Sequence, residues 1–194
     1  GPHSLKAKSR AVTAEDFEWL AIEASNSVAR VCALPTHERE GEITVVIVPK
    51  VAQSHPDILD KPNPSTELLR KVRNHLADRK LISTILNVQR ATFRELSTVV
   101  EIVVLQTAGS DRVKREIEKR IRWFLHPLKG GKEGKGWPFG RPVYRVDLYH
   151  VIEDVPGVDF VDRVRLVDEA TKLEVDQFKV GTGEPTVAQG IHWH

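Results

Sequence analysis

Four consecutive β-branched residues, Val45 to Val48, constrain the fold more than any other feature of the sequence. A half-buried strand alternates apolar and polar residues, whereas this run is apolar throughout, so it predicts a strand buried on both faces at the centre of a sheet. Val28 to Leu34, closed by Pro35, predicts a neighbouring strand. Leu96 to Gln106 is the strongest strand pattern, with Glu101 the one charged residue in its apolar run.

Helical spacing alternates with these strand patterns along the chain. Thr13 followed by Asp16 matches a capping box and predicts a helix over about 13–25. Apolar stripes predict further helices over 65–79 and 110–125, and another that starts at Pro142 and ends before Pro156. Short strands are expected at Ile82 to Val88 and at Val158 to Val167. This order predicts an α+β fold of two small α/β sandwich-like units, with mixed sheets covered by helices.

The same patterns divide the chain into four segments. Residues 1–9 are expected to be a linker after Gly1-Pro2-His3-Ser4, which resembles the remnant of a cleaved purification tag, so the chain is expected to begin inside a longer natural protein. Residues 10–92 form a first unit that contains an extended loop at Lys50 to Pro64, and residues 93–168 form a second. Residues 169–194 are expected to be a tail with one or two short strands.

Composition excludes several classes of protein. The 194 residues carry 29 Lys and Arg against 27 Asp and Glu, a balance that indicates neither a disordered polyelectrolyte nor a strongly basic nucleic-acid binder. The longest apolar runs fall far below the roughly 20 residues of a membrane-spanning helix. Cys32 is the one cysteine, which excludes an intramolecular disulfide and fits a reducing compartment. The sequence therefore predicts a soluble protein of a reducing compartment.

Patterns for catalysis, metals and cofactors are weak. Gly130 to Lys135 departs from a phosphate-binding P-loop in its glycine spacing and has no Ser or Thr after the lysine. His192 and His194 are two metal-ligand types in a segment that offers no complete ligand set. Cys32 lies in an apolar strand pattern, as a small core residue does, and no GxSxG sequence occurs. We therefore expect no enzyme activity, no cofactor, no metal and no small-molecule substrate.

The sharpest local feature is the loop from Gly130 to Pro142, which contains Gly136-Trp-Pro-Phe-Gly-Arg-Pro142. Two interpretations remain open for it. In one, Trp137 and Phe139 pack under their own loop as a satellite core. In the other, the loop contacts another subunit, because Trp, Phe and Arg are enriched at interfaces. The candidate interface residues are Trp137, Phe139, Arg141, Lys135 and Tyr144.

Nucleic-acid binding is the alternative function, since two units of mixed strands and basic helices also describe tandem RNA-binding folds. Such modules stack bases on aromatic residues of their central strands. Ile43 to Val48 and Val99 to Leu105 contain no aromatic residue. The pattern therefore favours a different function.

The loop belongs to a set of distinctive segments. They are His126-Pro-Leu-Lys-Gly-Gly131, Gly134-Lys-Gly-Trp-Pro-Phe-Gly-Arg-Pro-Val-Tyr144 and Ile152 to Val161, supported by Arg10 to Phe17, Ala29 to Val31, Val48-Pro49 and Pro64-Ser65. Together these segments resemble baseplate J-like proteins, the assembly proteins of contractile phage tails and related injection particles. The resemblance covers residues from about 10 to 168, which match the C-terminal portion of the family. Positions 170–194 have few counterparts.

The resemblance implies a structural role without catalytic residues or cofactors. Such proteins form the wedge ring of a baseplate, where copies join one another and a second wedge protein around a central hub. We therefore expect this chain to be a wedge-type component of a phage or phage-like particle. From the truncation relative to the family, we expect the isolated chain to be a monomer or a weak dimer.

Overall fold

The computed structural model of the chain describes residues 10–36, 38–51, 61–181, 183–184 and 186–193. The predicted linker over 1–9, most of the predicted loop over 50–64, and His194 lie outside them. The described residues divide into two compact units, with the boundary after Thr92 and residue 61 grouped with the second unit. No helix in the described ranges is both long and apolar enough to cross a membrane.

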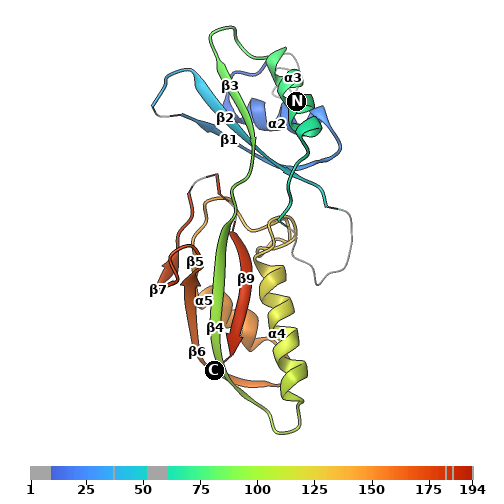
Figure 1. Cartoon of the computed structure of the whole chain (residues 1–194). Coiled ribbons are helices and arrows are strands. Elements are labelled where there is room, and N and C mark those ends of the chain that lie inside the picture. The colour runs from blue at the N-terminus through green and yellow to red at the C-terminus, as the bar shows by residue number, and fades with distance from the viewer. Residues whose placement is uncertain (1–9, 37, 52–60, 182, 185, 194) are drawn as a thin grey trace. The chain divides into compact units, whose positions relative to one another are not determined.

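The first unit contains a sheet of three strands in the order β1-β2-β3 (Figure 1). Strand β1 (Val28–Pro35) runs antiparallel to β2 (Glu42–Pro49), and β2 runs parallel to β3 (Ile85–Arg90). Residues Val45 to Val48 are all buried. The prediction that this run forms a central strand buried on both faces is therefore confirmed.

Two helices supply the rest of the first core. Helix α2 (Ala14–Ala24) begins after Thr13, whose hydroxyl accepts a hydrogen bond from the N–H of Asp16, as the capping box predicts. Helix α3 (Thr66–Ala77) begins after Ser65, which caps it in the same way. Apolar stripes of both helices pack with strand residues in one cluster that includes Phe17, Leu20, Val72, Leu76, Val45 and Ile47.

The second unit contains a four-stranded sheet in the order β7-β6-β4-β9. Strands β4 (Arg94–Val104) and β6 (Val158–Asp168) pair antiparallel, and β7 (Leu173–Val175) extends the sheet beside β6. Strand β9 (Thr186–Trp193) runs parallel to β4 on its other side. Both sheets therefore mix parallel and antiparallel pairs, which confirms the predicted α+β fold.

Helices α4 (Ser110–Phe124) and α5 (Arg145–Glu153) pack on the sheet of the second unit (Figure 1). The stripe of Val113, Ile117 and Ile121 on α4 joins Leu148 and Ile152 of α5 in one buried cluster. The same cluster contains Leu96, Val100, Val164 and Leu166 from the sheet. The helices thus cover the face of the sheet that carries these four side chains.

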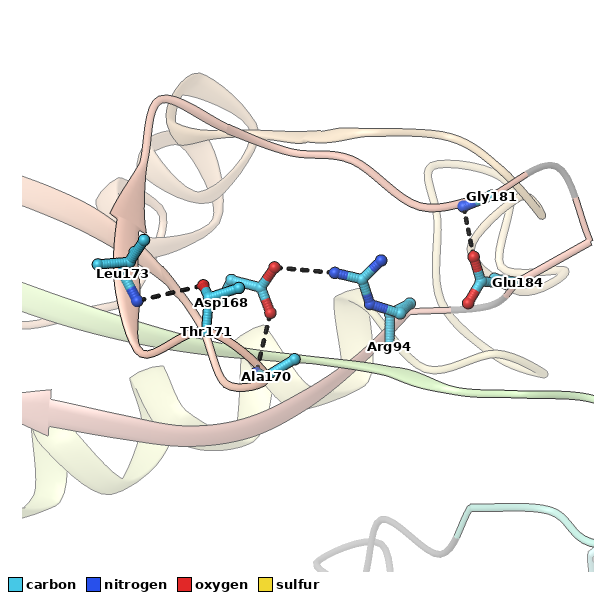
Figure 2. A network of polar contacts seen from close by, with 7 residues as sticks. All are labelled: Arg94, Asp168, Ala170, Thr171, Leu173, Gly181 and Glu184. Atoms are coloured by element: carbon cyan, nitrogen blue, oxygen red, sulfur yellow. Dashed lines mark hydrogen bonds and ion pairs between the residues drawn. The ribbon is translucent and has the colours of Figure 1, made fainter.

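An ion pair joins the start of β4 to the end of β6 (Figure 2). Arg94 Nη2 donates to Asp168 Oδ2 at 2.8 Å, and the other carboxylate oxygen accepts from the N–H of Ala170 at 3.0 Å. The Arg94 guanidinium also lies over the Phe178 ring, 5.5 Å from its centroid. Asp168 is buried, so these partners compensate a carboxylate that would otherwise lose its hydration.

The predicted start of the fourth helix at Pro142 is wrong. Val143 and Tyr144 instead form a short strand, β5 (Val143–Tyr144), which pairs antiparallel with β8 (Gln177–Phe178). Helix α5 then begins at Arg145, with the Asp147 carboxylate accepting from the N–H of Tyr144 at 2.9 Å. A pairing with residues more than 30 positions away therefore overrides the local helix signal at Pro142.

The segment expected to be a tail belongs to the second unit. It supplies β7 and β8, and β9 forms an outer strand of the main sheet. In the first unit, the strand expected from Ile82 begins only at Ile85, because residues 82–83 form a turn. Ile82 is consequently fully exposed instead of lying in a sheet.

Candidate interface on the second unit

The glycine-rich loop after α4 is held by backbone hydrogen bonds. The carbonyl of His126 accepts from the N–H groups of Gly130 at 2.9 Å and Trp137 at 3.1 Å, and the Gly131 N–H donates to the Phe124 carbonyl at 2.7 Å. These contacts bring the two ends of the loop together. The loop is therefore a defined structure that presents its middle, residues 131–136, at the surface.

His126 fixes the first turn of this loop through its ring. Nδ1 accepts from the N–H groups of Leu128 at 3.0 Å and Lys129 at 3.2 Å, so the ring is neutral with its proton on Nε2. Burial, with the nearby Lys129 ammonium as a second cause, lowers the pKa of His126. The neutral ring is thus the form that the loop requires.

Glycine is required at two positions of the loop for different reasons. A Cβ at Gly130 would lie 2.2 Å from the Phe124 carbonyl oxygen and 2.7 Å from the backbone of His126. Gly131 has a φ of +75°, a conformation that residues with a side chain rarely adopt. The glycines therefore permit close packing of the backbone. The loop also lies between helix α4 and strand β5, whereas a phosphate-binding P-loop lies between a strand and a helix.

Trp137 lies in the core of the second unit, with 1% of its surface exposed. Its ring meets Phe124 edge to face, with centroids 5.3 Å apart. Its Nε1–H donates to the Arg141 carbonyl at 3.1 Å, and the Arg141 guanidinium lies over the ring, 5.0 Å from the centroid. The position matches the interpretation in which Trp137 packs under its own loop, and its side chain is not available to a neighbouring subunit in this conformation.

The other four candidate interface residues lie nearer the surface. Lys135 and Tyr144 are exposed, whereas Phe139 and Arg141 are half-buried. Lys135 lies in the exposed middle of the loop, and Tyr144 is the last residue of β5, directly before α5. These four residues remain candidates for contact with a partner.

An open groove of about 940 Å³ lies between α4, α5 and the glycine-rich loop. We call it the α4–α5 groove. Its apolar lining comes from Trp123 and Phe124 at the end of α4 and from Val151 of α5. Lysines 119, 129 and 132 stand along its margin. None of the five candidate interface residues lines it.

Charged groups of both signs line the α4–α5 groove. The cations are the three lysines and Arg120, which donates to Glu116 at 2.9 Å. The carboxylates are Glu133, Asp154 and Asp147, which is engaged at the start of α5. Among the residues that the structure describes, the three lysines form no ion pair. The groove therefore offers ammonium groups outside ion pairs beside aromatic surface.

Trp123 is the functional candidate that sequence reasoning missed. It lies on α4 outside the apolar stripe of Val113, Ile117 and Ile121, and 44% of its surface is exposed. An aromatic residue off the buried stripe of an amphipathic helix was the available signal. Its exposed ring lines the α4–α5 groove together with Phe124 and Val151.

The remaining candidates from the sequence are Cys32 and His192, since His194 lies outside the described residues. In the described ranges, no cluster of three or more His, Cys, Asp or Glu side chains is placed to hold a metal ion. Burial, followed by the charge of Glu18, raises the pKa of the Cys32 thiol, although Arg30 opposes this. A raised pKa disfavours the nucleophilic thiolate. His192 lies exposed on β9.

The described chain is thus defined as an α+β protein of two units, with an anchored aromatic loop and an adjoining groove. No family model matches its sequence, and no curated protein matches it. Its fold is similar to a chain in the cryo-EM structure of the anti-feeding prophage (AFP) baseplate, 6-fold symmetrised, with a TM-score of 0.71 and 13% identity. The match covers 96% of this chain and 39% of that chain, so this chain spans well under half the length of that protein.

Proposed function

We propose that this chain is a non-enzymatic structural component of the baseplate of a contractile tail or injection particle, of the J-like wedge type. The observation that carries the proposal is the likeness of the fold, over 96% of the chain, to a chain of a baseplate. The resemblance of His126 to Tyr144 to baseplate J-like proteins supports it independently. In the structure these residues form the anchored loop described above.

The proposed partners are other baseplate subunits, namely copies of the chain itself and a second wedge protein. Exposed Lys135 and Tyr144, with half-buried Phe139 and Arg141, are the proposed contact residues of the loop. Trp137 supports this surface from beneath. The protein would be made and assembled in the cytoplasm and then remain part of the particle.

Particle assembly in the native host tests the proposal. Disruption of the coding region is expected to abolish complete particles in electron micrographs, and a tagged copy is expected to restore them and to sediment with them. Lys135→Glu with Tyr144→Ala is expected to reduce assembly while leaving the melting temperature unchanged. Complete particles formed without the chain would contradict the proposal.

A gel-shift assay addresses nucleic-acid binding as the competing function. We expect no retardation of mixed RNA or DNA at about 0.15 M salt, since binding through phosphates weakens steeply with salt. Tight binding under that condition, combined with complete particles in the disrupted strain, would favour the nucleic-acid function.

A further inference from the structure

An apolar tip projects from the first unit at the turn between α3 and β3. Ile82 is fully exposed there, and Ile85 at the start of β3 is 50% exposed. We call this pair the Ile82 tip. Ile82 and Ile85 are three positions apart, so this turn offers two large apolar side chains to a partner.

Carboxylates lie beside the Ile82 tip. The N–H of Ile85 donates to the Gly41 carbonyl at 2.8 Å, and Ile85 pairs with Glu42 across β2 and β3. The adjoining hairpin segment 38–42 carries three glutamates and one arginine. Arg39 lies 4.0 Å from Glu42, whereas Glu38 and Glu40 are exposed and pair with no described cation. The Ile82 tip is therefore apolar, and the hairpin segment beside it is negatively charged.

The α4–α5 groove has the complementary chemistry. Trp123, Phe124 and Val151 offer apolar surface, and Lys129 and Lys132 stand beside it on the glycine-rich loop. The groove is open to solvent and has a volume of about 940 Å³. Glu133 and Asp154 also line the groove and would repel an acidic occupant. The carboxylates of an occupant would therefore have to lie nearest Lys129 and Lys132.

We propose that the Ile82 tip of one copy docks in the α4–α5 groove of the next copy. Ile82 and Ile85 would contact Trp123 and Phe124, while Glu38 and Glu40 would approach Lys129 and Lys132. The inference rests on the proposed function, in which copies of the chain join one another in a ring. Contacts between two different surfaces of identical chains build a ring when the rotation from copy to copy closes. The few side chains involved make each contact weak, as interfaces of small area are.

Photo-crosslinking of the purified chain tests this contact. A benzoylphenylalanine at Ile82 leaves folding intact because that side chain touches no core, and irradiation at about millimolar protein traps weak complexes. We expect a crosslinked dimer whose joined peptides map to residues 119–134 or 147–154. The same probe at Ile22, an exposed position on α2, is expected to give no such product. No dimer, or a dimer joined elsewhere, would overturn the inference.

A charge exchange gives a second readout. Glu38→Lys with Glu40→Lys is expected to reduce the crosslinked dimer several-fold, and so is Lys129→Glu with Lys132→Glu. Mixing the first variant, carrying the probe, with the second is expected to restore the dimer, because opposite charges face each other again. Arg70→Glu with Lys71→Glu on the exposed side of α3 serves as the matched control and is expected to change nothing. Absence of restoration, with all variants melting like the parent, would contradict the contact.

The two tests separate the inference from the proposed function. Particles that contain the chain, together with crosslinks outside the groove, would reject the contact and keep the baseplate role. Crosslinks in the groove from a chain that never enters particles would reject the baseplate role and keep the contact.

Discussion

The carboxylate of Glu18 on α2 accepts a hydrogen bond from the backbone N–H of Ala33 on β1 at 3.0 Å. At the opposite edge of the same sheet, Arg73 of α3 donates to the Val88 carbonyl at 3.3 Å. Ala33 and Val88 both pair with Val45, so the three residues form one row across the sheet. The two side-chain contacts lie at the two ends of this row, one at each edge strand. Because unpaired edge strands invite pairing with other chains, both helices protect this sheet against extension.

Removal of both edge contacts is expected to promote association through strands. Glu18→Ala with Arg73→Ala should cost about 1–3 kcal/mol, as lost hydrogen bonds to charged groups do, and should produce aggregates on mild heating. Thermal unfolding with simultaneous light scattering measures both effects, and Lys71→Ala on the exposed side of α3 is the control. A double variant that scatters no more than this control would refute the protective role.

Trp137→Ala is expected to destabilise the second unit by about 3–5 kcal/mol, because the ring is buried against Phe124 and its Nε1–H is bonded. The melting temperature should fall by roughly ten degrees or more. Phe139→Ala, at a half-buried position, is expected to cost less. Equal and small losses for both variants in calorimetry would show that the loop does not depend on the buried ring.

Gly130→Ala is expected to disrupt the anchored loop, since the added Cβ would meet the Phe124 carbonyl at 2.2 Å and backbone must move. Gly134→Asn provides the comparison. A Cβ there has nothing within 4 Å, and Asn tolerates the φ of +71° better than most residues. Hydrogen exchange of the Gly131 and Trp137 amides should accelerate in the first variant alone. Unchanged protection in Gly130→Ala would contradict the packing.

His126 is expected to make stability depend on pH. Its pKa in the folded state is lowered from the ordinary 6.5, so the unfolded chain binds the proton first. Stability contributed by the neutral ring is therefore complete above about pH 6.5 and declines as the pH falls below it. Denaturant unfolding at several pH values should show this decline in the parent and less of it in His126→Asn, which keeps an uncharged acceptor. His150→Gln, at an exposed position, should retain the parent profile. Identical slopes for His126→Asn and the parent would exclude His126 as the cause.

Sequence reasoning succeeded where the signal was local. The run Val45 to Val48 predicted a central strand, and Thr13 with Asp16 predicted the start of a helix. It failed at Pro142, because β5 forms only through pairing with Phe178 and Gln177. Likewise, 186–193 has a weak pattern of its own and becomes a strand through pairing with β4. Non-local partners of this kind leave no trace in local periodicity.

The candidate site was predicted only in part. The aromatic loop stood out in the sequence, but the burial of Trp137 depends on Phe124 and on the carbonyl of Arg141. The groove depends on α4, α5 and the loop meeting in space, and its lysines and Trp123 come from separate segments. Residues on one helix face are visible in a sequence, whereas a concavity between elements is a property of the packed chain.

The parallel pairing of β9 with β4 bears on how the protein emerges from the ribosome. Arg94 pairs with Thr186, so about 90 residues are translated between the two strands. At a synthesis rate of about 5–20 residues per second, one edge of β4 stays unpaired for roughly 5–20 s until β9 has been made. Every strand of the first unit has been made by then. The nascent second sheet therefore benefits from a chaperone or from rapid synthesis, since an open apolar strand is prone to wrong pairing during that interval.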